Sequence, residues 1–223
     1  MDRFLVLPDE TALADLGTYL ARADRIDRAS ARLVATSGVL AVYTAVLHPA
    51  GLMDETPTVL GLRTIAVEPT LGLDAVVPIA SLVERVRGAG LSGDRVVVGL
   101  PAEVHTVTWA GVAPPRKGWK RVDATTAGRL ADAARTGIRT VARVLPTDAG
   151  EALVRRVRSE VWGEPLDEAL QVPAGSAFAA DTLGFLGDPG EEVPVYETGP
   201  WIRLSTVRGH VLVKRRGWSL SRG

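Results

Sequence analysis

The hydrophobic pattern of this chain changes at Pro114 and Pro115, near the middle of its 223 residues. Before these prolines, short runs of β-branched residues alternate with Gly and Pro breaks, which is typical of β-strands. After them, apolar residues recur every three or four positions, which is typical of amphipathic helices. The pattern therefore predicts an α+β protein with a β-rich domain at 1–113 and a second domain at 114–223.

The first half is expected to be mostly sheet with two helices. Asp9 is a plausible N-cap for a helix that buries Leu13, Leu16 and Leu20. Ser37 and Gly38 interrupt a β-branched run and indicate a hairpin. The segments expected to be strands are 3–7, the two arms of the hairpin within 32–47, 58–67, 75–79, 95–100 and 104–112, and the second helix is expected at 81–90.

The second half is expected to be helical and to end in a β-hairpin. The first helix begins at Asp123 or Thr125 and ends before Pro146, and its apolar stripe is the strongest amphipathic signal in the chain. Asp148 and Glu151 resemble a capping box for a second helix that reaches about residue 162, and a third is expected at 174–186. Arg208-Gly209 indicates the hairpin turn. Three helices followed by a hairpin is the order found in winged-helix DNA-binding domains.

Composition removes several classes of function. The chain has no cysteine, which excludes a disulfide scaffold, a thiolate zinc site and a Cys nucleophile. Its three histidines, His48, His105 and His210, are too far apart for a metal-binding helix motif. We therefore expect no metal and no cofactor. The N-terminus lacks a signal-peptide pattern and no apolar stretch reads as a membrane span, so a cytoplasmic protein that does not contact membranes is expected.

The C-terminal hairpin combines basic and aromatic residues, and the segment RKGWKR adds a second such cluster. Aromatic and arginine side chains are the usual anchors of protein interfaces, and they also suit phosphate and base contacts. The candidate binding residues are Trp119, Trp201, Arg203, Arg208, Lys214, Arg215 and Trp218. A DNA-reading role is disfavoured, because residues 174–187 of the third helix offer no Arg, Lys, Asn or Gln and only one charge, Asp181.

Acid–base candidates are few, and each has a simple structural interpretation. Asp181 lies among apolar residues, where a carboxylate needs a partner such as an arginine. Glu103 and His105 are two apart on an expected strand, so they share one face and can pair on the sheet surface. The chain has no nucleophile elbow, no Walker A loop and no dinucleotide-binding glycine motif. No catalytic residue is therefore assigned.

Four segments carry a resemblance to a known group of proteins: WAGVAPPRKGW, VWGEPL, AFAADTLGFLG and WIRLSTVRGHVLVKRR. Together they resemble a family of uncharacterised actinobacterial proteins of similar length. The resemblance covers nearly the whole chain and implies a bacterial, cytoplasmic setting and two linked domains of unknown function. It implies no activity and no functional residues.

These observations favour a non-catalytic binding or accessory module that acts through protein–protein contact or self-association. One alternative is a nucleic-acid-binding protein that uses the basic C-terminal hairpin. Another is a hydrolase-type enzyme that uses Asp181 or the pair Glu103 and His105.

Overall fold

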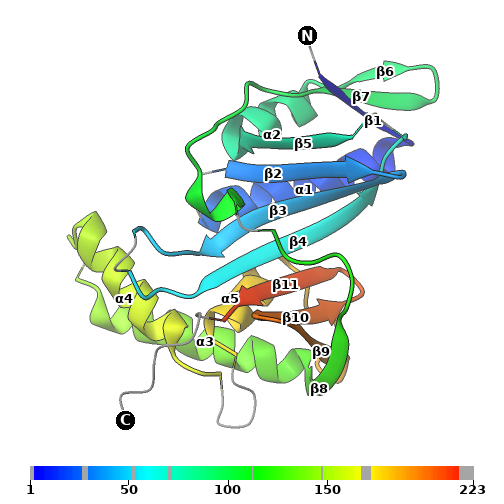
Figure 1. The fold of residues 1–223 in the computed structure, drawn as a ribbon. Coiled ribbons are helices and arrows are strands. Elements are labelled where there is room, and N and C mark those ends of the chain that lie inside the picture. Colours follow the sequence, from blue (N-terminus) through cyan, green and yellow to red (C-terminus); the bar gives the residue numbers. More distant parts are fainter. Residues whose placement is uncertain are drawn as a thin grey trace. The chain divides into compact units, whose positions relative to one another are not determined.

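The structure is a computed structural model that describes residues 3–26, 30–51, 54–69, 72–111, 113–146, 148–166 and 172–215. These residues form five α-helices and eleven β-strands, which confirms the expected α+β class (Figure 1). By their contacts, residues fall into two compact units: a first unit of 1–45 with 62–112, and a second unit of 46–61 with 113–223.

The first unit contains two helices and two antiparallel sheets. One sheet has the order β1-β7-β6, and this unit's strands in the other sheet have the order β5-β2-β3-β4. Helices α1 and α2 pack against each other, and both contact β7. The bounds are β1 Phe4–Leu7, α1 Glu10–Ile26, β2 Ser30–Thr36, β3 Val39–Leu47, β4 Thr58–Ala66, β5 Leu73–Pro78, α2 Ile79–Arg87, β6 Gly90–Ser92 and β7 Arg95–Gly99.

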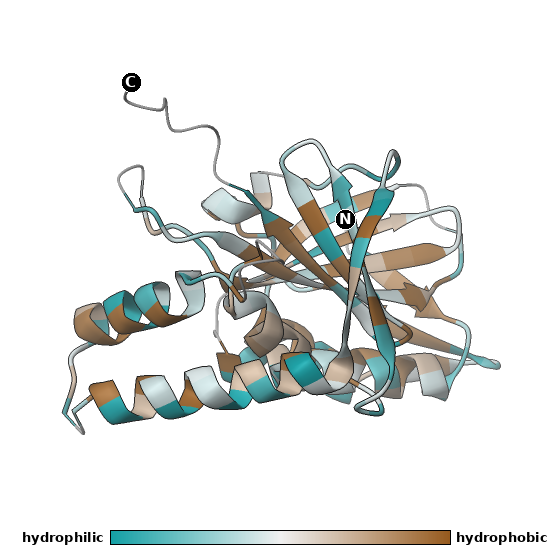
Figure 2. Ribbon diagram, turned by 90° about the horizontal axis from the view of Figure 1, so that it is seen from below, coloured by the Kyte–Doolittle hydropathy of each residue, from teal (hydrophilic) through white to brown (hydrophobic). Residues whose placement is uncertain are grey.

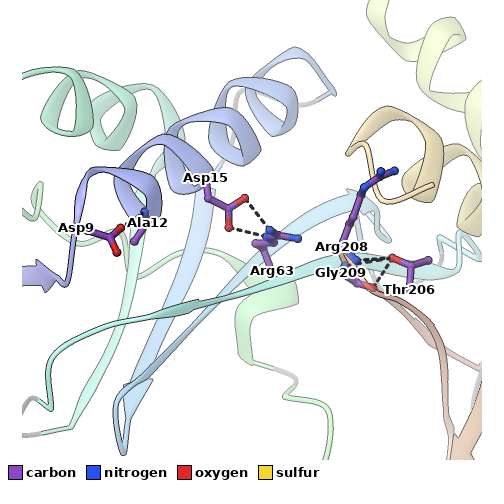
Figure 3. Close-up of polar contacts among 7 residues, drawn as sticks. All are labelled: Asp9, Ala12, Asp15, Arg63, Thr206, Arg208 and Gly209. Atoms are coloured by element: carbon purple, nitrogen blue, oxygen red, sulfur yellow. Dashed lines mark hydrogen bonds and ion pairs between the residues drawn. The ribbon is translucent and has the colours of Figure 1, made fainter. Parts of the chain in front are cut away.

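Local signals in the first half are confirmed. The carboxylate of Asp9 accepts a hydrogen bond of 2.8 Å from the Ala12 backbone N–H, and so caps α1 (Figure 3). Leu16 and Leu20 of that helix are fully buried. Ser37 and Gly38 have φ values of 50° and 79°, and the strands that they join pair in antiparallel register. Positive φ at both residues of a two-residue loop matches the right-handed twist of a hairpin.

Residues 104–111 do not form the strand that the apolar pattern of 104–112 predicts, and residue 112 lies outside the described residues. The Val104 N–H donates a 2.8 Å hydrogen bond to the Val76 carbonyl of β5. Thr108–Gly111 then form a short 3₁₀ helix in which Trp109 and Ala110 are buried. An apolar run of this length reads as a strand, but here it buries its side chains through a single helical turn.

The second unit contains four antiparallel strands and three helices. The sheet order is β11-β10-β9-β8, and α5 packs against both α3 and β11. The elements are β8 Lys120–Thr126, α3 Ala127–Val144, α4 Glu151–Gly163, α5 Gly175–Thr182, β9 Glu192–Thr198, β10 Trp201–Thr206 and β11 Gly209–Lys214. The expected order of three helices and a terminal hairpin is confirmed, and β8 and β9 extend that hairpin into a sheet.

The hairpin turn lies where the sequence places it. Thr206 pairs with Gly209, and the Thr206 hydroxyl oxygen accepts hydrogen bonds from the backbone N–H groups of Arg208 and Gly209 at 3.1 and 3.2 Å (Figure 3). This side-chain contact closes the turn between β10 and β11.

Three expected boundaries in the second half are wrong. Asp123 and Thr125 lie in strand β8, and the helix begins after Thr126, whose hydroxyl accepts from the Arg129 N–H. The N-cap of α4 is Gly150, without a side-chain cap, so Asp148 does not form a capping box. Helix α5 ends at Thr182, before the predicted 186. Each error falls at an element end, where tertiary pairing overrides local propensity.

Helices α3 and α4 pack through a glycine notch. Trp162 of α4 is 2% exposed and stacks on Phe178 of α5, with ring centroids 4.5 Å apart. A Cβ atom at Gly137 of α3 would lie 2.1 Å from Cζ3 of the Trp162 ring. Only a glycine at position 137 therefore allows the indole to lie this close to the α3 backbone. Hydrophobic and hydrophilic residues alternate along α3, as its amphipathic pattern predicts (Figure 2).

Residues 46–61 belong to the second unit although they come from the first half of the sequence. The hydroxyl groups of Thr56 and Ser159 lie 2.5 Å apart and form a hydrogen bond to α4. A side chain at Gly175 would meet Leu47, and one at Gly163 would meet Pro57. The segment therefore covers α4 and the start of α5.

Among the described residues, no helix combines the length and the apolarity needed to cross a bilayer.

Candidate partner-binding site

Strand β10 presents two faces of different character. Ile202 and Leu204 are 1% exposed and form part of the core. Arg203 lies between them in the sequence and is half-buried on the opposite face, because successive side chains of a strand point to opposite sides. Trp201 and Leu212 share that face with Arg203 and are only 3% and 1% exposed, so the face is partly covered and Arg203 lies at its half-buried part.

Two aromatic rings flank the Arg203 guanidinium. Its Cζ lies 4.6 Å from the ring centroid of Trp119 and 4.7 Å from that of Tyr196. Tyr196 is the cross-strand partner of Arg203 in the β9–β10 register, which sets the second contact. Each contact is a cation–π interaction worth about 0.5–2 kcal/mol. Trp119, Tyr196 and Arg203 form one cluster, which we call the arginine–aromatic cluster.

The Trp119 ring is held in place by its own loop. Its Nε1–H donates a 2.9 Å hydrogen bond to the Pro115 carbonyl. Gly118, immediately before it, has a φ of +84°, a conformation that favours glycine. The turn formed by PRKGW therefore fixes the indole beside the strands before a partner binds.

Arg203 has an unused hydrogen-bond donor. Its Nε is buried and has no hydrogen-bond partner among the described residues. Burial lowers the pKa of the Arg203 guanidinium from its ordinary value, and the electrostatic interaction with Tyr196 opposes that shift. A buried donor without an acceptor is unfavourable by about 1–3 kcal/mol. The structure therefore leaves this buried Nε–H without an acceptor, while the guanidinium as a whole is half-buried.

The other candidate residues lie in different surroundings. Trp201 is 3% exposed, so its ring belongs to the core of the unit. Arg208 donates to the Leu186 carbonyl, and Arg215 pairs with Glu197. Lys214 is half-buried opposite Trp201 in the hairpin register. Trp218 lies outside the described residues. The structure thus brings Trp119 and Arg203 together, whereas Arg208 and Arg215 contact the protein's own acceptors.

Tyr196 is a site residue that the sequence does not single out. It lies in the alternating run VPVYET, which reads as an ordinary strand. Its position opposite Arg203 depends on the turn at Gly199 and Pro200, which sets the register between β9 and β10. Predicting a β-hairpin over 192–206 with Tyr196 opposite Arg203 would have identified this residue from the sequence.

Glu103 and His105, the second candidate pair, line one open cavity of about 260 Å³ in the first unit. Arg32 and Asp74 line it too, and Arg32 makes a bidentate pair with Asp74 at 2.7 and 2.8 Å. Glu103 pairs with Arg3. The carboxylates that face this cavity are thus held by arginines of the same unit. Glu103 and His105 lie in an irregular segment and not on the strand that was expected for them.

Asp181 does not join either group. It lies near the end of α5 and is half-buried, so it does not require the partner that a fully buried carboxylate would need. No group of three or more His, Cys, Asp or Glu side chains within the described parts of the chain is arranged to hold a metal ion.

Two family models match this chain. Residues 1–111 match the domain of unknown function DUF8010, and residues 114–218 match the domain of unknown function DUF8185. This confirms the expected resemblance to proteins of unknown function, whereas an actinobacterial source and two separate domains at 1–113 and 114–223 stay predictions. No curated protein sequence matches the chain.

The chain is similar in fold to bacterial DNA polymerase sliding clamps. The clamp of Caulobacter crescentus is 13% identical with a TM-score of 0.50, and the match covers 98% of this chain and 67% of the clamp. A candidate DNA polymerase III beta subunit of Eubacterium rectale is 9% identical with a TM-score of 0.54, covering 98% of this chain and 66% of that one. The chain thus spans about two thirds of the length of these proteins, and at such identity the likeness concerns the fold alone.

Proposed function

We propose that this chain, which matches two consecutive domains of unknown function and has a sliding-clamp fold, is a non-catalytic accessory protein. It acts by binding another protein chain, either a different protein or a second copy, through the arginine–aromatic cluster. The observation that carries the proposal is the half-buried Arg203 guanidinium, which lies within 4.7 Å of two ring centroids and keeps a buried Nε without a hydrogen-bond partner in the described chain.

The chemistry of this cluster supports binding rather than reaction. An arginine stays protonated at neutral pH even when burial lowers its pKa, so it serves poorly as a general base. Trp119 and Tyr196 supply rigid ring surface, and such residues concentrate the binding energy of interfaces. The fold likeness agrees with an accessory role, since the similar structures are described as sliding clamps and beta subunits of a DNA polymerase.

A nucleic acid is the second candidate partner. The segment RKGWKR supplies Arg116, Lys117 and Lys120 next to Trp119, and such a cluster attracts phosphate. Against it, the hairpin arginine Arg215 pairs with Glu197, which leaves less positive charge on the hairpin than its sequence suggests. Binding of this kind would weaken steeply as salt is raised.

Photo-crosslinking in cells tests the proposal. A photoreactive amino acid replaces exposed Lys117 in the loop of the cluster, and the control replaces Leu153, which is 43% exposed on α4. We expect an adduct of discrete mass with a protein at position 117 and none at 153, and light scattering of the pure protein shows whether that protein is a second copy. Adducts to nucleic acid alone, or equal protein adducts at both positions, would contradict the proposal.

A further inference from the structure

The Arg203 side chain offers more hydrogen-bond donors than the protein uses. A guanidinium carries five N–H donors in one plane and no acceptor. Within the described chain, Nε is buried without a partner and Arg203 forms no ion pair. The Trp119 and Tyr196 rings contact the cation at 4.6 and 4.7 Å, but they offer no lone pair comparable to that of an oxygen. An acceptor for these donors is what the cluster lacks.

The loop beside the cluster carries positive charge. Arg116 and Lys117 are exposed and form no ion pair within the described residues, whereas Lys120 lies opposite Glu197 in the β8–β9 register. The segment 115–121 contains four cations and no acid. A partner that contacts Trp119 therefore meets an excess of positive charge within a few residues of the ring, and charge complementarity calls for an anionic group.

We propose that the partner presents a carboxylate to Arg203, from a protein segment rich in Asp and Glu. This inference rests on the proposed function, because it names the chemistry of the partner for the same cluster. A carboxylate is planar and has two oxygens, so it can accept two parallel N–H bonds from one guanidinium. The two ring contacts hold the guanidinium before binding, which reduces the entropy lost when that pair forms.

A protein carboxylate fits this face better than a nucleic acid does. Strands β8 and β9 alternate charges of both signs: Arg121 pairs with Glu192 at 2.6 Å, and Glu197 pairs with Arg215. Both glutamates oppose any anion laid along these strands, so the preference for a carboxylate over a phosphate rests on the rings. The two rings also each contact Arg203, so the cluster does not present the pair of open rings between which a base would stack.

Fluorescence anisotropy with two labelled probes of equal length tests the inference. One probe is a peptide of alternating Glu and Asp, and the other is oligothymidine. The variants are Arg203→Lys, which keeps the charge and loses the planar donor fork, and Trp119→Leu, which removes one ring. The matched control is Arg135→Lys on α3, where the arginine pairs with Asp132 on the helix surface. Thermal unfolding confirms that each variant is folded.

The acidic peptide is expected to bind the unmodified protein more tightly than oligothymidine at the same salt. Arg203→Lys should weaken peptide binding by about tenfold or more, which is the loss of one charge-assisted bidentate contact, and Trp119→Leu should weaken it less. Arg135→Lys should leave it unchanged. As a second measurement, the Arg203 Nε–H resonance should shift saturably when the peptide is added.

Three outcomes would overturn the inference: no binding of the acidic peptide at low salt, an affinity that Arg203→Lys leaves unchanged, or tighter Arg203-dependent binding of oligothymidine. The result can be separated from that of the proposed function. A protein adduct at position 117 without an Arg203-dependent peptide affinity rejects the carboxylate but keeps the binding role, whereas the absence of an adduct rejects the binding role itself.

Discussion

The glycine notch on α3 makes a quantitative prediction about Gly137→Ala. In an exposed helix this substitution stabilises a protein by about 1 kcal/mol, because alanine has the higher helix propensity. Here the new methyl would lie 2.1 Å from Cζ3 and 2.4 Å from Cη2 of Trp162. Overpacking of a filled core destabilises by about 1–3 kcal/mol, and a contact this short places the substitution at the upper end.

Trp162 has little freedom to move away from that methyl. Its ring is 2% exposed and stacks on Phe178 at an interplanar angle of 25°. Its Cβ and carbonyl also lie 3.3 and 3.1 Å from where a Cβ at Gly175 would be. We therefore expect a net loss of about 2 kcal/mol, which lowers the Tm of a chain of this size by roughly 4–8 °C.

The assay is thermal and urea unfolding of four proteins: the unmodified chain, Gly137→Ala, Trp162→Leu and the double variant. Trp162→Leu alone leaves a cavity and destabilises by about 2–4 kcal/mol. In that background Gly137→Ala should be neutral or stabilising, because the clashing ring is gone. Gly17→Ala on α1, where the methyl would meet only the Val86 Cγ1 at 3.3 Å, is the control and should change stability by less than about 1 kcal/mol. Additive effects of the two substitutions would refute the notch.

Three further predictions concern the first unit. Burial raises the pKa of the Tyr19 phenol above its ordinary value of 10.0, despite a 2.7 Å hydrogen bond with the Thr44 hydroxyl, so the folded protein keeps a proton that the unfolded chain loses at high pH. Stability should therefore fall as the pH rises above about 10, and urea titrations should show a smaller fall in Tyr19→Phe. Asp9→Ala removes the cap of α1 and should lower the free energy of unfolding by about 1 kcal/mol, whereas Asp9→Asn should restore most of it; equal losses in both would exclude capping. Asp15→Asn breaks the bidentate pair with Arg63, at 2.7 and 2.9 Å, and should destabilise by about 1 kcal/mol at low salt and by less at high salt, measured by thermal unfolding (Figure 3).

Features decided by a few adjacent residues could be predicted from the sequence. Ser37-Gly38 and Arg208-Gly209 lie at hairpin turns, and Leu16 and Leu20 are buried on one stripe of α1, because turn chemistry and helical periodicity are local. The α+β class follows from the same signals. The aromatic and cationic side chains of Trp119 and Arg203 are enough to make them candidate contact residues.

The contacts of those residues could not be predicted, because they depend on pairing between distant segments. Tyr196 faces Arg203 through the β9–β10 register, and Trp119 reaches it from a loop more than 80 residues earlier in the sequence. The end of strand β8 was expected to be helical from Asp123 or Thr125, since the residues of VDATT do not reveal that β9 pairs with them. Arg32 and Asp74 likewise meet across 42 positions.

The contacts of residues 46–61 bear on how this protein can be dissected. Because Leu47, Thr56 and Pro57 cover helices that are encoded after residue 150, a fragment that starts at 114 would expose the surfaces beneath them. Such a fragment would be prone to aggregate, and swapping the two halves between relatives would mismatch that covering segment with its helices. Chimeras and truncations of this protein should therefore carry 46–61 along with the C-terminal half.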